Sequence, residues 1–293
     1  MLLLEQLNHT SMLSSGQRAI ACWLVDHRDE MATVTTKRIA TETFTSPAAV
    51  VRLAKRLGYE GFEPLRRELI AEASYLSQHF CGVDANHPFV TSDRPLAIAA
   101  KVTSLARETA QDTLALLDGE ALEQAVGLIV RARVVHMAAV SFPLLYAQDF
   151  QLKMRRLGRM VEVCSLVGEP LFTEPTLRED DCALAISYSG TTPATIDMAR
   201  MYKRRGIPLI VLTSMGDNEL RRLADVTLVL TTRERLYSKV AGFTSELSIK
   251  LVLDTLYACV FCSDIEGSQR AKDEISRRAE PGRRSDSALL RED

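Results

Sequence analysis

Residues 187–192, SYSGTT, are the part of this chain best suited to hold an anion. They follow an apolar run, and a helical pattern with Pro193 in its first turn begins directly after them. Side-chain hydroxyls, N–H groups exposed by a glycine turn and the positive end of the helix dipole converge there. These groups predict a phosphate-sized binding site made by Ser187, Ser189, Gly190, Thr191 and Thr192.

The same residue types raise three alternatives to a phosphate-ester site at 187–192. The segment has no lysine and lacks the spacing G-x-x-x-x-G-K-[ST], which argues against a nucleoside triphosphate site of that kind. The hydroxyls can instead cap the helix and satisfy the turn without any ligand. Ser189 as an acyl-transfer nucleophile is disfavoured, because it lacks the G-x-S-x-G frame and an evident histidine partner.

Metal ligands and catalytic groups are sparse in the sequence. The histidines show no ligand spacing, and only Cys259 and Cys262 lie close together among six cysteines. Because that C-x-x-C lies in an apolar helical pattern with no second pair, two inert helix cysteines are favoured over a redox or metal site. Glu246 is the one carboxylate that we would nominate as a base if the chain were an enzyme, and His136 fits the interior of a strand. We expect no metal, no cofactor and no catalytic residue.

The elements that must position these groups alternate between short apolar runs and helical stretches. Strands are predicted at 133–140, 160–164, 182–187, 208–213 and 226–231, and helices at 144–157, 170–178, 192–205, 217–224 and 244–262. Apolar strands joined by helices predict a parallel sheet covered on both faces, with right-handed crossovers. Ligands of such sheets bind beyond the carboxyl ends of the strands, which is where the residues 187–192 lie.

A second informative segment, at 35–69, has the pattern of a helix-turn-helix. A short helix at 37–43 is followed by a tight connection, and Ser46 is a good N-cap for a second helix that stops at Gly58. Phe44 stands where many such turns carry glycine. We therefore expect this turn to depart from the usual left-handed geometry.

The outer face of that second helix carries small residues at its start and basic residues further along. Small residues let a helix approach base edges in the major groove, and Arg52 can read guanine or contact a phosphate. Residues 34–67 hold seven basic side chains against three glutamates, a local excess of +4, although the whole chain has a net charge of −2. We expect DNA contacts from Lys37, Ser46, Ala48, Ala49, Arg52, Lys55 and Arg56. An ordinary helical bundle with a solvated basic face is the alternative.

The length of 293 residues suggests two domains. The predicted division is a helical domain at 1–78, a linker at 79–94, an α/β domain at 95–264 that opens with a helix at 95–117, and a tail of frayed helix and disorder at 265–293. The amino terminus lacks the features of a secretory signal, and the apolar run at 251–262 is too short to span a bilayer. A cytoplasmic protein without a membrane partner is expected.

Both informative segments resemble one protein family. The S-x-S-G-T-T loop followed by GIPLIVLTSMGDNELRRLADVTLVL resembles a sugar isomerase (SIS) domain. Together with IATETFTSPAAVVRLAKRLGYEGFEPLR, it resembles the MurR/RpiR family of bacterial transcriptional regulators, over about residues 1–262 and in the family's domain order. The resemblance implies an all-α helix-turn-helix domain and an α/β domain with a flavodoxin-like, five-stranded parallel sheet and helices on both faces.

The resemblance also implies a function. The chain would be a sequence-specific DNA-binding regulator of a sugar or carbohydrate operon, paired as a homodimer or homotetramer, and controlled by a phosphosugar effector. Ser187, Ser189 and Thr192 would hold the phosphate, while Gly190 and Thr191 shape the loop. The alternative is a phosphosugar isomerase or lyase with an added helical domain, which needs a base such as the carboxylate at position 246.

A second ligand loop of the form G-x-G-x-S usually follows the first strand in this family. This chain reads AVSFP from Ala139 to Pro143, with Ser141 at one of the glycine places. Cβ atoms and a proline without an N–H restrict close approach of the backbone to a ligand. Either Ser141 takes over part of the contact, or the effector is bound differently or weakly. We include Ser141 and Glu246 among the candidate effector contacts.

Overall fold

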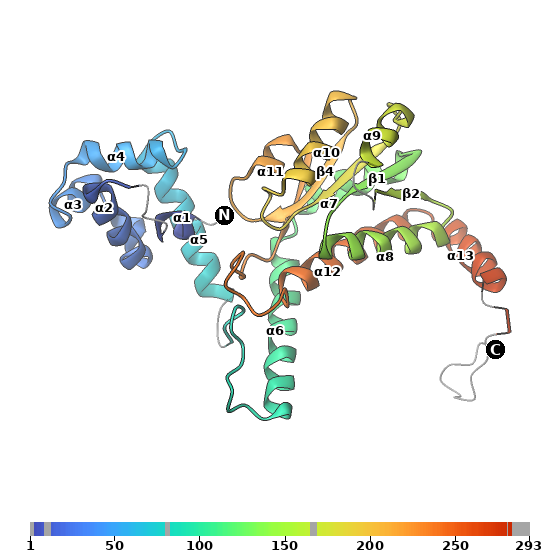
Figure 1. Ribbon diagram of the computed structural model, residues 1–293, viewed down its shortest axis with the longest axis horizontal. Helices are drawn as coiled ribbons and strands as arrows, with labels where there is room; N and C mark the ends of the chain where they lie inside the picture. Colours follow the sequence, from blue (N-terminus) through green and yellow to red (C-terminus); the bar gives the residue numbers. More distant parts are fainter. Residues whose placement is uncertain (1–2, 9–12, 80–82, 165–168, 280, 283–293) are drawn as a thin grey trace. The chain divides into compact units, whose positions relative to one another are not determined.

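The computed structural model, shown in Figure 1, describes residues 3–8, 13–79, 83–164, 169–279 and 281–282. The chain divides into two compact units. The first comprises Met1–Glu108 with the short segments Met215–Asp217 and Tyr237–Val240, and the second comprises the remainder. The division falls within helix α6 (Pro95–Leu116). The finer boundaries at 78, 94 and 264 stay predictions.

The first unit is helical up to α6. Its elements are α1 (Leu3–Asn8), α2 (Ser15–Asp26), the 3-10 helix η2 (Arg28–Thr33), α3 (Thr36–Glu42), α4 (Pro47–Arg56) and α5 (Phe62–His79). One apolar core joins them, with contributions from Leu7, Ile20, Leu24, Ile39, Leu53 and Leu65. Helix α1, at six residues, is too short to show a helical period of its own in the sequence.

Helix α4 begins and ends as the sequence predicted. The Ser46 hydroxyl accepts a hydrogen bond from the Ala49 N–H at 3.2 Å, and Pro47 occupies the first helical position. Gly58 follows the end of the helix with a φ of 92°. The apolar face with Leu53 is buried against the core, so the opposite face of α4 points outward.

The turn between α3 and α4 is left-handed at Phe44, where φ is 52°. The expectation that this phenylalanine would move the turn away from left-handed geometry is therefore wrong. Thr45 N–H donates to the Ala40 carbonyl at 2.9 Å, and the Thr43 hydroxyl donates to the Ile39 carbonyl at 2.7 Å. These bonds on both sides of the residue offset the roughly 1–2 kcal/mol that a left-handed conformation costs an L-residue.

The second unit contains a five-stranded parallel sheet in the order β2-β1-β3-β4-β5. Its strands are β1 (Val134–Ala138), β2 (Met160–Val163), β3 (Cys182–Ile186), β4 (Leu209–Ser214) and β5 (Val226–Leu230). The predicted fold class is confirmed, and the order 2-1-3-4-5 is that of flavodoxin-like sheets. Because the order reverses between β1 and β3, the connections that follow these two strands diverge from each other.

Helices cover both faces of this sheet (Figure 1). They are α7 (Gly119–Arg131), α8 (Phe142–Arg156), α9 (Glu169–Thr173), the 3-10 helix η3 (Glu174–Thr176), α10 (Pro193–Arg204), α11 (Glu219–Leu223) and α12 (Ser245–Ser263). Helix α13 (Ile265–Ala279) follows α12 and has no buried residue. Leu184 and Ile186 of β3 join one core with α7, α8 and α12, whereas Ala183 and Ala185 join another with α10 and α11. This alternation places each strand between two apolar layers.

Two helices differ from the sequence-based prediction. Helix α7 is absent from that prediction, although the Asp118 carboxylate caps it by accepting from the Ala121 N–H at 2.8 Å. Helix α13 is regular as far as Ala279, within the tail that was expected to be frayed helix followed by disorder. Residues 283–293 lie outside the described part of the chain, and so does the segment 80–82 of the predicted linker.

Candidate functional site

Ser187 is the centre of the loop that follows β3. Its side chain is buried, with 3% of the residue exposed. Its hydroxyl lies 2.8 Å from Thr192 Oγ1 and 3.4 Å from Ser189 Oγ, and it accepts the Gly190 N–H at 3.2 Å. The structure therefore brings together the hydroxyls that the sequence placed five residues apart.

Ser189 is a second acceptor in the same loop. The N–H and the hydroxyl of Thr191 both donate to Ser189 Oγ, at 3.2 Å and 3.1 Å. Thr191 is exposed, and Ser189 is half-buried. The loop thus bonds its hydroxyls to one another, and Ser189, Thr191 and Thr192 all remain at least partly exposed.

Gly190 cannot carry a side chain in this loop. Its φ is 64°, and a Cβ atom there would overlap the Asn218 Oδ1. Asn218 is held by two further bonds: its Nδ2 donates to Thr213 Oγ1 at 3.2 Å, and its Oδ1 accepts the Arg221 N–H at 2.9 Å as the cap of α11. The sequence did not identify Asn218, although Asn directly before a helical stretch is a capping signal that could have found it.

The amino terminus of α10 begins directly after the loop. Thr192 is the N-cap residue but makes no side-chain capping bond, Pro193 has no N–H, and the first turn has no acidic residue. Helix capping by these hydroxyls, one part of the ligand-free alternative, is therefore not observed, whereas the hydroxyls do satisfy the turn itself. The positive end of this helix dipole lies next to a cluster of hydroxyl groups, which suits an anion.

The loop after β1 contains a second unusual backbone conformation. Ser141 has a φ of 59° and a ψ of −135°, a region occupied almost entirely by glycine, and its side chain is exposed and does not cap α8. Within the described residues, Phe44 and Ser141 are the two positive-φ residues other than glycine. Ser141 thus keeps a backbone path typical of glycine and adds a hydroxyl at the sheet's switch point.

Glu246 lies in the first turn of α12 and is tied to α8. The Tyr146 hydroxyl donates to Glu246 Oε2 at 3.1 Å. Burial and this bond raise the pKa of Tyr146 to about 12, so the phenol stays protonated at neutral pH and keeps donating this hydrogen bond. A Cβ on Gly242 would overlap Glu246 Oε1, because the carboxylate lies over that backbone. In the described structure no hydrogen bond joins Glu246 to the 187–192 loop.

Tyr188 and Glu234 are site residues that sequence reasoning missed. The Tyr188 hydroxyl donates to the Glu234 carbonyl at 2.9 Å and accepts the Glu234 N–H at 3.0 Å. The buried Glu234 carboxylate accepts the N–H and hydroxyl groups of Thr244 and Ser245, at 2.5 to 3.2 Å. The loop is therefore connected to the start of α12 by two side chains. No local pattern could have revealed bonds across 46 residues.

His136 is a core residue, as predicted. It is 1% exposed, with Nε2 lying 3.1 Å from Asp181 Oδ2 and Nδ1 lying 3.2 Å from Glu162 Oε2. Arg133 also donates to Asp181 Oδ2, at 2.8 Å. The imidazole therefore belongs to a charged cluster at the base of β1 and β3, away from the strand ends that carry the loop.

Cys259 and Cys262, the C-x-x-C pair of the sequence, lie on α12. Cys259 is half-buried and Cys262 is exposed, and both are free thiols. Burial raises the pKa of the Cys259 thiol, which makes it a poorer nucleophile. The ranges that the structure describes contain no group of three His, Cys, Asp or Glu residues able to hold a metal, and no helix in them is long and apolar enough to cross a bilayer. Cys81 is outside those ranges.

The residues predicted to contact DNA lie on α3 and α4. Lys37, Ser46, Ala48, Arg52, Lys55 and Arg56 are exposed, and Ala49 is half-buried. Arg56 donates to Gln17 Oε1 at 3.3 Å. Neither Arg52 nor Lys55 has a hydrogen-bond or ion-pair partner among the residues that the structure describes. Two positive charges on the outer face of α4 are thus free to contact another molecule.

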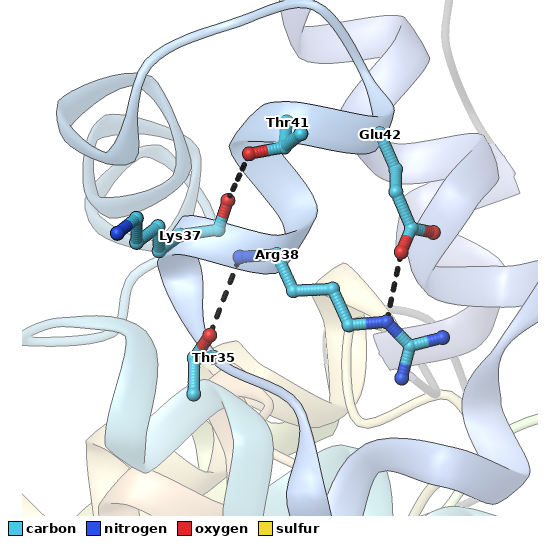
Figure 2. A pocket seen from close by; sticks show the side chains of 5 residues that line it. All are labelled: Thr35, Lys37, Arg38, Thr41 and Glu42. Atoms are coloured by element: carbon cyan, nitrogen blue, oxygen red, sulfur yellow. Dashed lines mark hydrogen bonds and ion pairs between the residues drawn. The ribbon is translucent and has the colours of Figure 1, made fainter.

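A hollow of about 320 Å³ lies on the surface of α3, lined by Thr35, Lys37, Arg38, Thr41 and Glu42 (Figure 2). Arg38 donates to Glu42 and to Glu30, each at 2.8 Å. These bonds raise the pKa of Arg38 and lower that of Glu42. Figure 2 shows Lys37 pointing away from this ion pair. Lys37, unlike Arg38, therefore keeps its charge available on the α3 surface.

Two family models match the chain. The helix-turn-helix domain of the rpiR family matches residues 1–75, and the SIS domain matches residues 129–258. The NanR protein of Vibrio vulnificus, solved in complex with ManNAc-6P, is 24% identical, with a TM-score of 0.63 over 97% of this chain and 100% of that one.

Two further solved structures resemble the SIS region. The sugar isomerase domain of an RpiR transcription factor from Sphaerobacter thermophilus is 25% identical, with a TM-score of 0.55 over 61% of this chain and 98% of that one. A putative sugar-phosphate isomerase from Listeria monocytogenes is 17% identical, with a TM-score of 0.53 over 65% of this chain and 100% of that one. At such identities the likeness to NanR and to the isomerase concerns the fold.

Proposed function

Because the chain belongs to the RpiR family by its two domains, we propose that it is a DNA-binding transcriptional regulator of sugar metabolism controlled by a phosphosugar. The observation that carries the effector half is the hydroxyl cluster of residues 187–192 at the uncapped start of α10. The observation that supports the DNA half is the exposed basic face of α4. Neither the 187–192 loop nor the α4 face contains an evident acid–base pair for catalysis.

The phosphate of the effector would bind where the loop meets α10. Ser189 and Thr192 hydroxyls donate to its oxygens, Ser187 holds both in place, and Gly190 and Thr191 shape the turn. The helix dipole stabilises the negative charge by an expected 0.3–1 kcal/mol or somewhat more. Ser141, across the switch point, would supply a further hydroxyl.

The second half of the proposal concerns DNA. Helix α4 would enter the major groove with its small amino-terminal residues, Ser46, Ala48 and Ala49, against base edges. Arg52 would contact a base or a phosphate, and the side chains Lys37, Lys55 and Arg56 would neutralise phosphates. Such a role places the protein in the cytoplasm, with the DNA that it reads.

Self-association would present two or more reading helices to one operator, as a homodimer or homotetramer. Phe142, Leu145 and Leu152 lie along one side of α8 and are each more than half exposed, which supports an apolar contact between copies. An effector that favours one arrangement of the copies would change operator affinity by an expected 1–3 kcal/mol of coupling, a range typical of allosteric proteins. Light scattering of the purified protein would give the number of chains.

The DNA half is tested with duplexes enriched from a random pool by the wild-type protein, together with the duplex that flanks its own gene. Arg52→Ala combined with Lys55→Ala should abolish retention of these duplexes in a gel shift. The matched control is Arg270→Ala combined with Arg278→Ala, which removes two exposed charges from α13. Failure to enrich any duplex, or equal loss in both double variants, contradicts the proposal.

The effector half is tested by thermal unfolding in the presence of individual sugar phosphates, ManNAc-6P among them. At least one should raise the unfolding midpoint of the wild-type protein, since a ligand that binds only the folded state stabilises it. Ser189→Ala should remove that rise, whereas Ser263→Ala on α12 should keep it. Turnover of a stabilising sugar phosphate that is lost in Glu246→Gln would instead favour an isomerase.

A further inference from the structure

Phe44 is an exposed aromatic residue in a strained turn. Its side chain is 97% exposed although the residue has a φ of 52°. A left-handed backbone is unfavourable for phenylalanine, and glycine would occupy it without strain. The ring gains no stabilising burial in return. Neither the exposed ring nor the left-handed backbone stabilises the fold. Contact with another molecule therefore explains both better than packing within the chain does.

The turn fixes the backbone position from which this ring extends. Thr43 Oγ1 lies 2.9 Å from Thr45 Oγ1, and the Thr45 N–H donates to the Ala40 carbonyl at 2.9 Å. The Phe44 N–H itself points to the Thr41 carbonyl at 3.4 Å. The backbone is thus bonded before, at and after the aromatic residue. A rigid turn loses little conformational freedom on binding, which suits recognition.

The neighbourhood of the ring favours DNA over protein as its partner. Phe44 lies two residues before Ser46, the cap of α4, so it stands beside the end of the helix that would enter a major groove. The exposed side chains Lys37, Arg52 and Lys55 of the same two helices are basic, and the cores of protein–protein interfaces are depleted of lysine. Basic groups beside one apolar ring match the sugar-phosphate edge of a duplex.

We propose that the Phe44 ring contacts an apolar group at the groove edge of operator DNA, a thymine methyl or a deoxyribose, beside the point where α4 enters. The inference rests on the proposed function and adds a residue that neither charge nor the helix face identifies. Thymine methyl groups are the usual apolar partners of such side chains in the major groove. With a thymine methyl as partner, Phe44 gives sequence preference to a turn that otherwise only positions helices, whereas a contact with deoxyribose adds affinity alone.

The test measures affinity for the enriched duplex by fluorescence anisotropy. Phe44→Ala and Phe44→Gly should weaken binding by about tenfold, as expected for loss of one good base-edge contact. The slope of affinity against salt should stay unchanged in both, whereas Arg52→Ala should lower it by about 1 because a phosphate contact is lost. Phe172→Ala removes an 82% exposed ring from α9 and should change nothing.

Folding and the two DNA partners are separated by further arms of the experiment. The unfolding midpoint of Phe44→Gly should equal or exceed that of the wild type, which excludes misfolding as the cause of weaker binding. Replacing single thymines by uracil should weaken wild-type binding at one position, and Phe44→Ala should be insensitive there, if a methyl group is the partner. If deoxyribose is the partner, no uracil has an effect and Phe44→Ala still binds weakly.

Two results would overturn the inference and they are distinguishable. Binding of Phe44→Ala within about twofold of wild type, on a duplex that the wild-type protein does select, removes the role of Phe44 and leaves the regulator intact. Failure of the wild-type protein to select any duplex removes the proposed function and this contact with it.

Discussion

The loop at 187–192 and the outer face of α4 hold their polar side chains in opposite ways. In the loop, Ser187 bonds to its neighbours and the hydroxyls are locked together. On α4, Arg52 and Lys55 extend from the surface with no bonding partner in the described part of the chain. A small anion is recognised by few groups, so these must be fixed beforehand, whereas a long polyanion is held by many charges that adjust to it.

This difference has a consequence for mutagenesis. A change in the loop should alter stability and effector binding together, because the same bonds serve both. A change on the α4 face should alter DNA binding alone, because exposed charges contribute little to the fold. The following substitutions test that contrast, in order of their expected effect on the free energy of unfolding.

Gly190→Ala should have the largest effect. The left-handed φ and the contact with Asn218 Oδ1 should together lower the free energy of unfolding by about 2–4 kcal/mol and abolish effector binding. Gly206→Ala is the matched control, since Gly206 has a φ of 72° and nothing within 4 Å of its added Cβ. Chemical denaturation of both variants separates backbone strain from the clash. Equal losses of unfolding free energy in the two variants would show that the Asn218 side chain moves aside at little cost.

Ser187→Ala should lower the free energy of unfolding by about 1–2 kcal/mol, because a buried hydrogen-bonding centre is lost. Ser189→Ala should lower it less, since Ser189 is half-buried. Both should abolish the thermal shift produced by a sugar phosphate. If Ser187→Ala kept full stability and still bound the effector, the hydrogen bonds of Ser187 would not be needed to hold the loop in its binding conformation.

Ser46→Ala should lower the free energy of unfolding by about 1 kcal/mol through loss of the α4 cap. Thr35→Ala removes the corresponding cap of α3, where the hydroxyl accepts the Arg38 N–H at 3.2 Å, and should cost a similar amount. Only Ser46→Ala is expected to weaken operator binding as well. Equal loss of DNA affinity in both variants would mean that stability, and no contact at Ser46, sets affinity.

Lys55→Gln should change the free energy of unfolding by less than about 0.5 kcal/mol, as for most surface substitutions. It should nevertheless weaken DNA binding and reduce the salt slope by about 1. Lys272→Gln on α13 is the control and should leave DNA binding unchanged. A clear loss of stability in Lys55→Gln would break the contrast between the two surfaces.

The fold was largely predictable from the sequence, since the second unit alternates apolar strands with amphipathic helices. The missed helix α7 repeats Leu122, Ala125 and Ile129 at helical spacing, so its periodicity is present in the sequence. The capping signal at Asp118 was overlooked. Phe44 was misjudged for a different reason. The average preference of phenylalanine gives the free-energy cost of a left-handed conformation. Whether that cost is offset depends on the bonds that Thr43 and Thr45 make to α3, which the sequence does not show.

The candidate site was predictable only in its local part. The hydroxyls and glycine of 187–192 are contiguous, so their residue types indicated an anion site directly. Asn218 reaches Gly190 from the connection after β4, and Glu234 meets Tyr188 after β5. Those contacts depend on strand order, which puts distant connections at the same edge of the sheet. Composition and spacing carry no information about them.

The strand order also bears on folding kinetics. β1 pairs with β3 through Val135 and Cys182, so the two loops of the switch point meet only when segments almost fifty residues apart have joined. Closing such a connection is costly early in folding, and the proposed effector site would then be complete only late in sheet assembly. A sugar phosphate bound there stabilises contacts absent from the transition state, and it should slow unfolding while leaving the refolding rate nearly unchanged.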